Sequence, residues 1–357
     1  MSLEDLKKKI QKNVKGVHVD VLSNSNIANI KEWVPTPHYD LNRVLSGSIF
    51  KGLPEKSLTT LVGPEASFKS SFMCLTMANA QKQGYTPVII DSEGAWTDSF
   101  VKNWGLDSDN ILYIYAPFID EVIRVIGSLL GSGEKYIIGI DSIGNLETEK
   151  LEKELLDGET PKADMGALQK KIKRMLKILL AVCKKQNSIS LIAGHYYGSP
   201  SQYGNAQEIG GGYHMRLAPH IIISLKKSKI LEGPQGSQNV VGNRIKAITL
   251  KNRFFPAYQE TSVDINYREG IDKYSGLIDV AMDAGFIKKG GSWYTNTVTG
   301  DKCQGVSKIN EIINNDMLKE LDEYIEKTGY STINDEIEEV MEEVNKEINK
   351  PDKNKGK

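Results

Sequence analysis

The sequence lacks the features that mark secreted, metal-stapled or membrane proteins. Its three cysteines, Cys74, Cys183 and Cys303, are too scattered for a disulfide framework or for metal-ligand spacing. No apolar run approaches the length of a membrane span, and the N-terminus is a charged helical pattern without a secretory signal. We therefore expect a cytoplasmic protein in a reducing compartment.

An excess of charge of one sign is also missing. The chain has 45 Lys and Arg residues against 46 Asp and Glu residues, a net charge of −1. Global charge will not attract DNA, so any nucleic-acid site must be a local patch. Composition is ordinary for a globular protein, and there is no internal repeat. A chain of 357 residues can bury a full core, which predicts one large domain with smaller additions.

Strand and helix patterns alternate between residues 58 and 225. Near-continuous apolar strands separated by amphipathic helices favour an α/β fold with a largely parallel sheet covered on both faces. The strand patterns are Leu58–Val62, Pro87–Asp91, Ile111–Tyr115, Tyr136–Asp141, Ser188–Gly194 and His220–Leu225, with Ile245–Asn252 and Thr261–Tyr267 as edge strands. The helical patterns include Phe72–Gln83, Asp120–Leu130 and Asp164–Gln186.

The stretch Leu58–Phe72 is nearly a phosphate-binding loop, Gly-x-x-x-x-Gly-Lys-Ser/Thr. In such a loop the backbone N–H groups cradle phosphates, the lysine neutralises the β and γ groups and the hydroxyl holds Mg²⁺. Phe68 stands where the second glycine belongs. It must take either an ordinary negative φ or a tolerated strained one, with its ring turned away from the nucleotide. The expected nucleotide-binding residues are Gly63, Pro64, Glu65, Ala66, Ser67, Phe68, Lys69, Ser70 and Ser71.

Polar residues follow three more predicted strands at their carboxyl ends, where parallel sheets bind ligands. Asp141 could hold Mg²⁺ through water while Ser70 binds the metal directly. Glu93 could orient or deprotonate an attacking water, although Asp91 or Glu93 could instead cap the next segment. His195 is either a structural histidine or a sensor of the γ-phosphate.

Together these motifs resemble the RecA-type recombinases, and most nearly the phage UvsX branch. Residues 33–294 look like the ATPase core and C-terminal domain of that family. Phe68 departs from bacterial RecA, which has glycine there, and is similar to the Ser-Phe-Lys-Ser of the UvsX branch. The motifs are Gly63–Ser70, Asp91–Glu93, Ile140–Ser142, Gly210–Gly212, Lys251–Arg253, Gly270–Leu277 and Gly291–Tyr294.

The resemblance implies ATP and Mg²⁺ as cofactors and assigns roles within the site. Glu93 and Lys69 would be the catalytic residues, and Phe100 stands where an aromatic ring stacks on adenine. His195 replaces a glutamine that senses the γ-phosphate. Lys251 and Arg253 match basic residues that reach the ATP of the neighbouring subunit, which makes electrostatic sense because they would stabilise transferring charge only after assembly.

Two loops, near residues 146–166 and 196–215, would face DNA. The second is rich in glycine and aromatic residues that can stack on bases, and its alternative is a plain loop. The first is acidic between residues 147 and 159, so we expect residues 162–166 and the basic helix after them to make the contact; that helix could equally be an ordinary outer face. The expected DNA-binding residues are Lys162, Met165, Lys170, Tyr196, Tyr197, Tyr203, Gly210, Gly211, Gly212, Tyr213 and His214.

The expected domains are an N-terminal helix or oligomerisation arm (1–32), a RecA-like P-loop ATPase core (33–269), a small α/β C-terminal domain (270–332) and an acidic helix with a disordered tail (333–357). The N-terminal helix could instead be an ordinary solvated amphipathic helix. The acidic helix could be a solvated face, or it could screen duplex DNA or dock accessory proteins.

The expected function is ATP-dependent DNA strand exchange by a helical filament on single-stranded DNA, serving recombination, repair and recombination-dependent replication. Partners would be single- and double-stranded DNA and further copies of the chain, with single-strand-binding and loader proteins as candidates and no membrane; a phage protein would act in the host cytoplasm. Alternatives are a hexameric helicase and a non-catalytic, nucleotide-gated module. The segment 270–294 and the lack of a long N-terminal domain favour the recombinase, and Glu93 and Asp141 disfavour the module.

Overall fold

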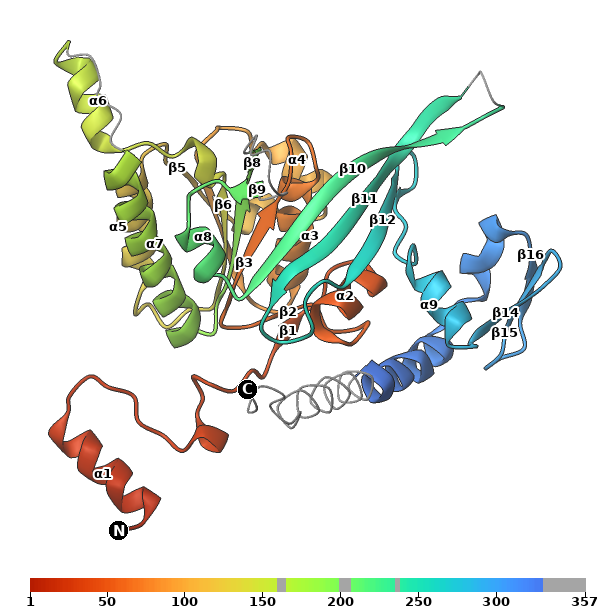
Figure 1. Ribbon diagram of the computed structural model, residues 1–357, viewed down its shortest axis with the longest axis horizontal. Helices are drawn as coiled ribbons and strands as arrows, with labels where there is room; N and C mark the ends of the chain where they lie inside the picture. Colours follow the sequence, from red (N-terminus) through yellow and green to blue (C-terminus); the bar gives the residue numbers. More distant parts are fainter. Residues whose placement is uncertain (159–164, 199–206, 235–237, 330–357) are drawn as a thin grey trace, which may run out of the picture. The chain divides into compact units, whose positions relative to one another are not determined.

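The computed structural model describes residues 1–158, 165–198, 207–234 and 238–329 (Figure 1). The chain forms two compact units. The first contains Met1–Ser46 and Lys51–Ser275, and the second contains Gly47–Phe50 and the described residues from Gly276 onward. The predicted acidic helix and tail, residues 333–357, lie outside the described residues.

One sheet dominates the first unit. Among the described residues it has nine strands in the order β13-β12-β11-β10-β3-β7-β6-β4-β5. Strands from β10 to β5 in this order run parallel, and β11, β12 and β13 add to one edge antiparallel, so the expected largely parallel sheet is confirmed. The strands are β3 (Ser57–Val62), β4 (Thr86–Asp91), β5 (Leu112–Tyr115), β6 (Tyr136–Asp141), β7 (Ile189–Gly194), β10 (Ile221–Glu232), β11 (Asn239–Asn252), β12 (Glu260–Asn266) and β13 (Gly270–Ile271).

Helices cover both faces of this sheet, because successive side chains of a buried strand point to opposite faces. Leu61 packs in the core with Met73 of α3, whereas its neighbour Val62 packs in the core with Leu179 of α7. Helices α2 (Tyr39–Ser46), α3 (Lys69–Lys82) and α4 (Asp98–Asn103) lie on the first face, and α5 (Ile119–Leu129) and α7 (Met165–Lys185) lie on the second.

Short elements complete the first unit. Strands β1 (Trp33–Val34) and β2 (Leu53–Pro54) form a small antiparallel pair, as do β8 (Tyr196–Gly198) and β9 (Gln207–Ile209). Helix α6 (Glu149–Leu156) precedes α7, and α8 (His214–Leu217) precedes β10. Strands β10 and β11 continue beyond the other strands as a hairpin (Figure 1), so both are longer than expected.

The second unit is small and mixed. It contains α9 (Leu277–Asp283) and the antiparallel strands β14 (Ile287–Gly290), β15 (Trp293–Asn296) and β16 (Lys302–Gln304). A helix begins at residue 315 and is described as far as residue 329. Asp322 on this helix accepts hydrogen bonds from Ser48 Oγ at 3.0 Å and from the Ile49 N–H at 2.7 Å, which ties Gly47–Phe50 to this unit.

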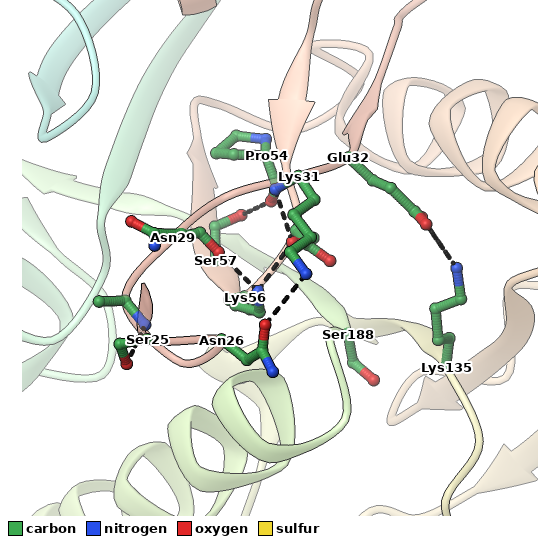
Figure 2. Close-up of polar contacts among 12 residues, drawn as sticks. Ser25, Asn26, Asn29, Lys31, Glu32, Pro54, Lys56, Ser57, Lys135 and Ser188 are labelled. Atoms are coloured by element: carbon green, nitrogen blue, oxygen red, sulfur yellow. Dashed lines mark hydrogen bonds and ion pairs between the residues drawn. The ribbon is translucent and has the colours of Figure 1, made fainter. Parts of the chain in front are cut away.

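The N-terminal segment is held to the first unit just before β1 rather than through its helix. Helix α1 (Leu3–Asn13) buries none of its residues. Behind it, Lys56 Nζ donates to Glu55 Oε1 at 2.8 Å and to the Asn29 carbonyl at 2.7 Å (Figure 2). The same carboxylate oxygen accepts the Lys31 N–H at 2.7 Å. Because the side chains of this ion pair are buried, removing either partner would leave an uncompensated charge, so the contact firmly fixes the segment before β1.

Gly63 and Phe68 are constrained positions in the turn from β3 into α3. A Cβ on Gly63 would lie 2.4 Å from the Leu225 carbonyl oxygen, so only glycine fits there. Phe68 precedes α3 with φ +80°, in the left-handed region that normally favours glycine. Its ring packs edge-on against Trp104, with the ring centroids 5.6 Å apart. Of the two conformations expected for Phe68, the structure has the strained one.

Two substitutions separate the strain at Phe68 from the packing of its ring. Phe68→Ala and Phe68→Gly both delete the ring contact with Trp104, but glycine alone relieves the positive φ. We therefore expect Phe68→Gly to be more stable than Phe68→Ala by about 1 kcal/mol, measured by urea unfolding. An alanine variant as stable as the glycine variant would show that this position does not carry a left-handed backbone.

Candidate nucleotide site

The parallel register brings the predicted site residues to one edge of the sheet. Strand β3 ends at Val62 beside Gly194 of β7, and Asp91 of β4 pairs with Asp141 of β6. Gly63 and His195 directly follow two of these strands. Because the carboxyl ends of parallel strands share an edge, the loop after β3 and the strand-end acids face one region.

Ser70 and Asp141 meet at the centre of this region. Ser70 Oγ donates to Asp141 Oδ2 at 2.5 Å, and the indole Nε1 of Trp96 donates to the same oxygen at 3.0 Å. Burial raises the pKa of Asp141, and the two hydrogen bonds act against that rise.

A hydroxyl and a carboxylate in contact suit Mg²⁺, which commonly takes one or two protein ligands together with phosphate oxygens. The described part of the chain contains no group of three or more His, Cys, Asp or Glu residues that could hold a metal ion. Ser70 and Asp141 therefore fit a metal that is bound jointly with a phosphate ligand.

Lys69 is the cation of the loop. It is buried, and its Nζ donates to the Pro64 carbonyl at 2.7 Å and to the Gly63 carbonyl at 3.1 Å. Burial lowers the pKa of Lys69, whereas the nearby carboxylates, foremost that of Asp141, act in the opposite direction. The ammonium group thus lies over the loop backbone, where the phosphates of a bound nucleotide would be cradled.

Asp91 organises the segment that carries Glu93. Asp91 is fully buried, and its Oδ1 accepts the N–H groups of Glu93 and Gly94, both at 2.9 Å. Asp91 therefore takes the capping role that the sequence left open. Glu93 is exposed, and its Oε1 accepts hydrogen bonds from Ser142 Oγ at 2.8 Å and Asn145 Nδ2 at 2.7 Å.

His195 and Phe100 are the remaining residues of this chain that the sequence places near the nucleotide. His195 follows β7 and is partly exposed, and its carbonyl accepts the Gly210 N–H at 2.8 Å. Phe100 lies on α4 with its ring edge-on to Trp96 at a centroid distance of 5.3 Å.

A pocket of about 580 Å³ adjoins the loop and includes residues that the sequence did not point to. They come from the end of α4 and from the antiparallel strands, which approach the loop only because β10 pairs with β3. Apart from Gly270, which begins the motif Gly270–Leu277, no local motif marks them. Besides residues 66–71, the lining residues are Asn103, Trp104, Lys227, Asn243, Ile245, Ile265, Asn266, Tyr267 and Gly270.

Lys251 and Arg253 are not brought to the loop of their own chain. Lys251 pairs with Ile222, which pairs in turn with Thr60 in the middle of β3, so Lys251 lies short of the carboxyl edge. Ile222 packs in the core on the α7 face, opposite to α3. Lys251 Nζ donates to the Arg216 and Leu217 carbonyls at 3.0 and 2.8 Å. Burial, and secondarily Arg253, lowers the pKa of Lys251.

The predicted DNA-binding residues are described in part. Lys162 and Tyr203 lie outside the described residues. Met165 begins α7, Lys170 is exposed on that helix, and Tyr196 and Tyr197 belong to β8. The glycine run 210–212 leads to Tyr213, which is 69% exposed, and to His214, which begins α8.

None of the helices in the described ranges is long and apolar enough to cross a membrane.

Comparisons with known proteins identify the family of the chain. The RecA N-terminal domain family matches residues 2–272. The protein RecA of Clostridioides difficile is 29% identical over 291 residues, 81% of each chain. The protein RecA of Aquifex aeolicus is 30% identical over 260 residues, 72% of each chain. These matches do not favour a helicase, and the chain belongs to the RecA family, as a RecA-type recombinase and DNA-dependent ATPase.

Proposed function

We propose that the chain binds Mg²⁺ and ATP at residues 63–71 and forms filaments on single-stranded DNA that exchange strands with a duplex. The observation that carries this proposal is the contact of Ser70 with Asp141 beside the buried Lys69, at the carboxyl edge of a parallel sheet. Lys69 would exchange its carbonyl partners for the β- and γ-phosphates. Ser70 and Asp141 would hold Mg²⁺, which neutralises phosphate charge when bound.

Glu93 is the proposed general base. Asp91 holds the backbone of its segment, and Ser142 and Asn145 hold its carboxylate, so it is presented at the edge of the site without being buried. A carboxylate placed there would orient the attacking water and accept its proton. His195 would sense the γ-phosphate and pass its state to the loop that follows. Phe100 is proposed to stack on adenine.

The trans role of Lys251 and Arg253 rests on the polarity of the sheet. Both lie away from the carboxyl edge of their own sheet, so a cation reaching the γ-phosphate from these positions would come from a neighbouring copy. Further support for assembly is the last strand of the sheet, β5, on which Leu112, Tyr113 and Tyr115 are exposed. Helix α1, with no buried residue, would be the arm that contacts a neighbouring subunit.

The DNA-facing residues are proposed to be the two loops near 146–166 and 196–215. An exposed Tyr213 after three glycines supports this for the second loop, because an aromatic ring can stack on any base. The exposed Lys170 is a candidate phosphate contact on α7.

The finer placement of the chain in the phage UvsX branch is also proposed. Phe68 in the glycine position of the loop, held with a positive φ, supports it. Action in the cytoplasm of a host cell, together with single-strand-binding and loader proteins, follows from that placement.

Loss of the loop lysine tests the nucleotide site. Lys69→Ala should lower ATP turnover on single-stranded DNA by about 100-fold or more, because a preorganised cation at the transferring charge is removed. Lys82→Ala, at the exposed end of the same helix α3, is the matched control and should retain turnover. Normal turnover by Lys69→Ala would refute the assignment of the phosphate loop.

Mixing two inactive variants tests the shared active site. The Lys69→Ala variant retains Lys251 and Arg253. The double variant Lys251→Ala, Arg253→Ala retains the intact phosphate loop. When the two variants are mixed in equal amounts, about a quarter of the interfaces in a head-to-tail filament would join an intact loop to an intact Lys251 and Arg253. We therefore expect about a quarter of wild-type turnover. Turnover of the mixture no higher than the average of the two variants would contradict a trans role.

A single exposed tyrosine tests the second loop. Tyr213→Ala should weaken single-stranded DNA binding by roughly 5- to 100-fold, the loss expected for one base stack, while ATP affinity is retained. Fluorescence anisotropy of a labelled oligonucleotide at fixed salt measures the first quantity, and binding of a fluorescent ATP analogue measures the second. The control is Tyr258→Ala, because Tyr258 is 76% exposed between β11 and β12. Equal DNA affinity of Tyr213→Ala and the control would count against this contact.

A further inference from the structure

Trp96 connects the two strand-end acids of the site. It is 7% exposed and lies five residues after Asp91, in the segment that also carries Glu93. Its backbone N–H donates to Asp91 Oδ2 at 3.0 Å, and its indole Nε1 donates to Asp141 Oδ2 at 3.0 Å. The main chain of Trp96 is therefore anchored on β4 while its side chain reaches the carboxylate at the end of β6.

The anchor on Asp91 is itself rigid. Asp91 is fully buried, and besides Trp96 it accepts hydrogen bonds from the N–H groups of Glu93 and Gly94 and from the Tyr113 hydroxyl at 3.1 Å. The ring of Phe100 packs edge-on against the indole. The direction of the indole N–H is thus set by contacts that do not involve Asp141.

The two oxygens of Asp141 are used differently as a result. Oδ2 accepts both the Ser70 hydroxyl at 2.5 Å and the Trp96 indole at 3.0 Å. A carboxylate oxygen has two lone pairs, so these two donors fill Oδ2. No donor from the described residues reaches Oδ1, which keeps its acceptor capacity. Ser70 donates its hydroxyl hydrogen bond to Oδ2, so the lone pairs of the Ser70 oxygen are still available to a cation.

We propose that Trp96 is a positioning residue for the metal site: its indole N–H fixes the carboxylate of Asp141 so that Oδ1 and the Ser70 oxygen face the metal together. This inference rests on the proposed Mg²⁺ and ATP site. It states that Trp96 sets the affinity of that site for Mg²⁺. Outer-shell donors of this kind typically change metal affinity by about 10- to 100-fold. A phenylalanine would keep an aromatic ring at this position, although a smaller one, and it would leave Oδ2 with Ser70 as its donor and free the carboxylate to rotate.

The test separates metal affinity from nucleotide affinity. Trp96→Phe keeps an aromatic ring beside Phe100 and removes the N–H. Binding of a fluorescent ATP analogue is measured first in EDTA and then as a function of Mg²⁺ concentration. We expect the affinity in EDTA to equal that of the wild type, whereas the Mg²⁺ concentration for half-maximal binding should rise about tenfold or more.

The matched control is Trp33→Phe. Trp33 begins β1, its ring packs edge-on against Phe254 at a centroid distance of 6.2 Å, and it does not line the pocket beside the loop. It should bind the analogue with the wild-type Mg²⁺ requirement. If Trp96→Phe fails to fold, benzothienylalanine at position 96 removes only the donor, because sulfur replaces the N–H in a ring of the same shape.

The outcomes distinguish this inference from the function on which it rests. A raised Mg²⁺ requirement with unchanged affinity in EDTA supports the positioning role. A wild-type Mg²⁺ requirement in Trp96→Phe, or an equal loss of affinity with and without Mg²⁺, overturns that role. Wild-type protein whose binding of the analogue is insensitive to Mg²⁺ would instead overturn the proposed metal site itself.

Discussion

The parallel pairing of β3, β7, β6 and β4 is the constraint on which the site depends. It places Asp91 beside Asp141 and brings the loop after β3 to the same edge, although these segments lie far apart in the chain. In an antiparallel arrangement the same strand-end residues would alternate between two edges. One register therefore gathers a cation, a hydroxyl and three carboxylates into a region that can bind phosphate and metal.

The polarity of the sheet also keeps Lys251 and Arg253 away from the loop of their own chain. Lys69 lies at the carboxyl edge, whereas Lys251 and Arg253 lie toward the other end of the strands and contact carbonyls near α8. Burial disfavours the charge of both Lys69 and Lys251, which raises the benefit of an anionic ligand to either. On the proposed trans role, a head-to-tail polymer would bring these two cationic groups to one phosphate, so that the chemistry would require assembly.

The loop after β3 contains a residue with a strained backbone. Phe68 holds a left-handed backbone without the freedom of glycine, and its ring packs edge-on against Trp104. Trp96 shows the complementary device, a buried indole whose N–H must find a partner and finds the carboxylate of Asp141. Aromatic side chains thus contact the loop after β3 at Phe68 and the proposed metal ligand Asp141 at the end of β6.

Strong local patterns are enough to predict most of the parallel strands and the loop after β3. Apolar runs predict the parallel strands to within a residue or two at most ends, and a motif and a strand end mark Gly63, Lys69 and Asp141. The remaining residues of the pocket and the partner of Asp141 depend on tertiary packing. Tyr267 and Asn103 line the pocket, and Trp96 reaches Asp141, through contacts between segments distant in the chain. No periodicity encodes such contacts, because they depend on strand order and on the direction of single side chains.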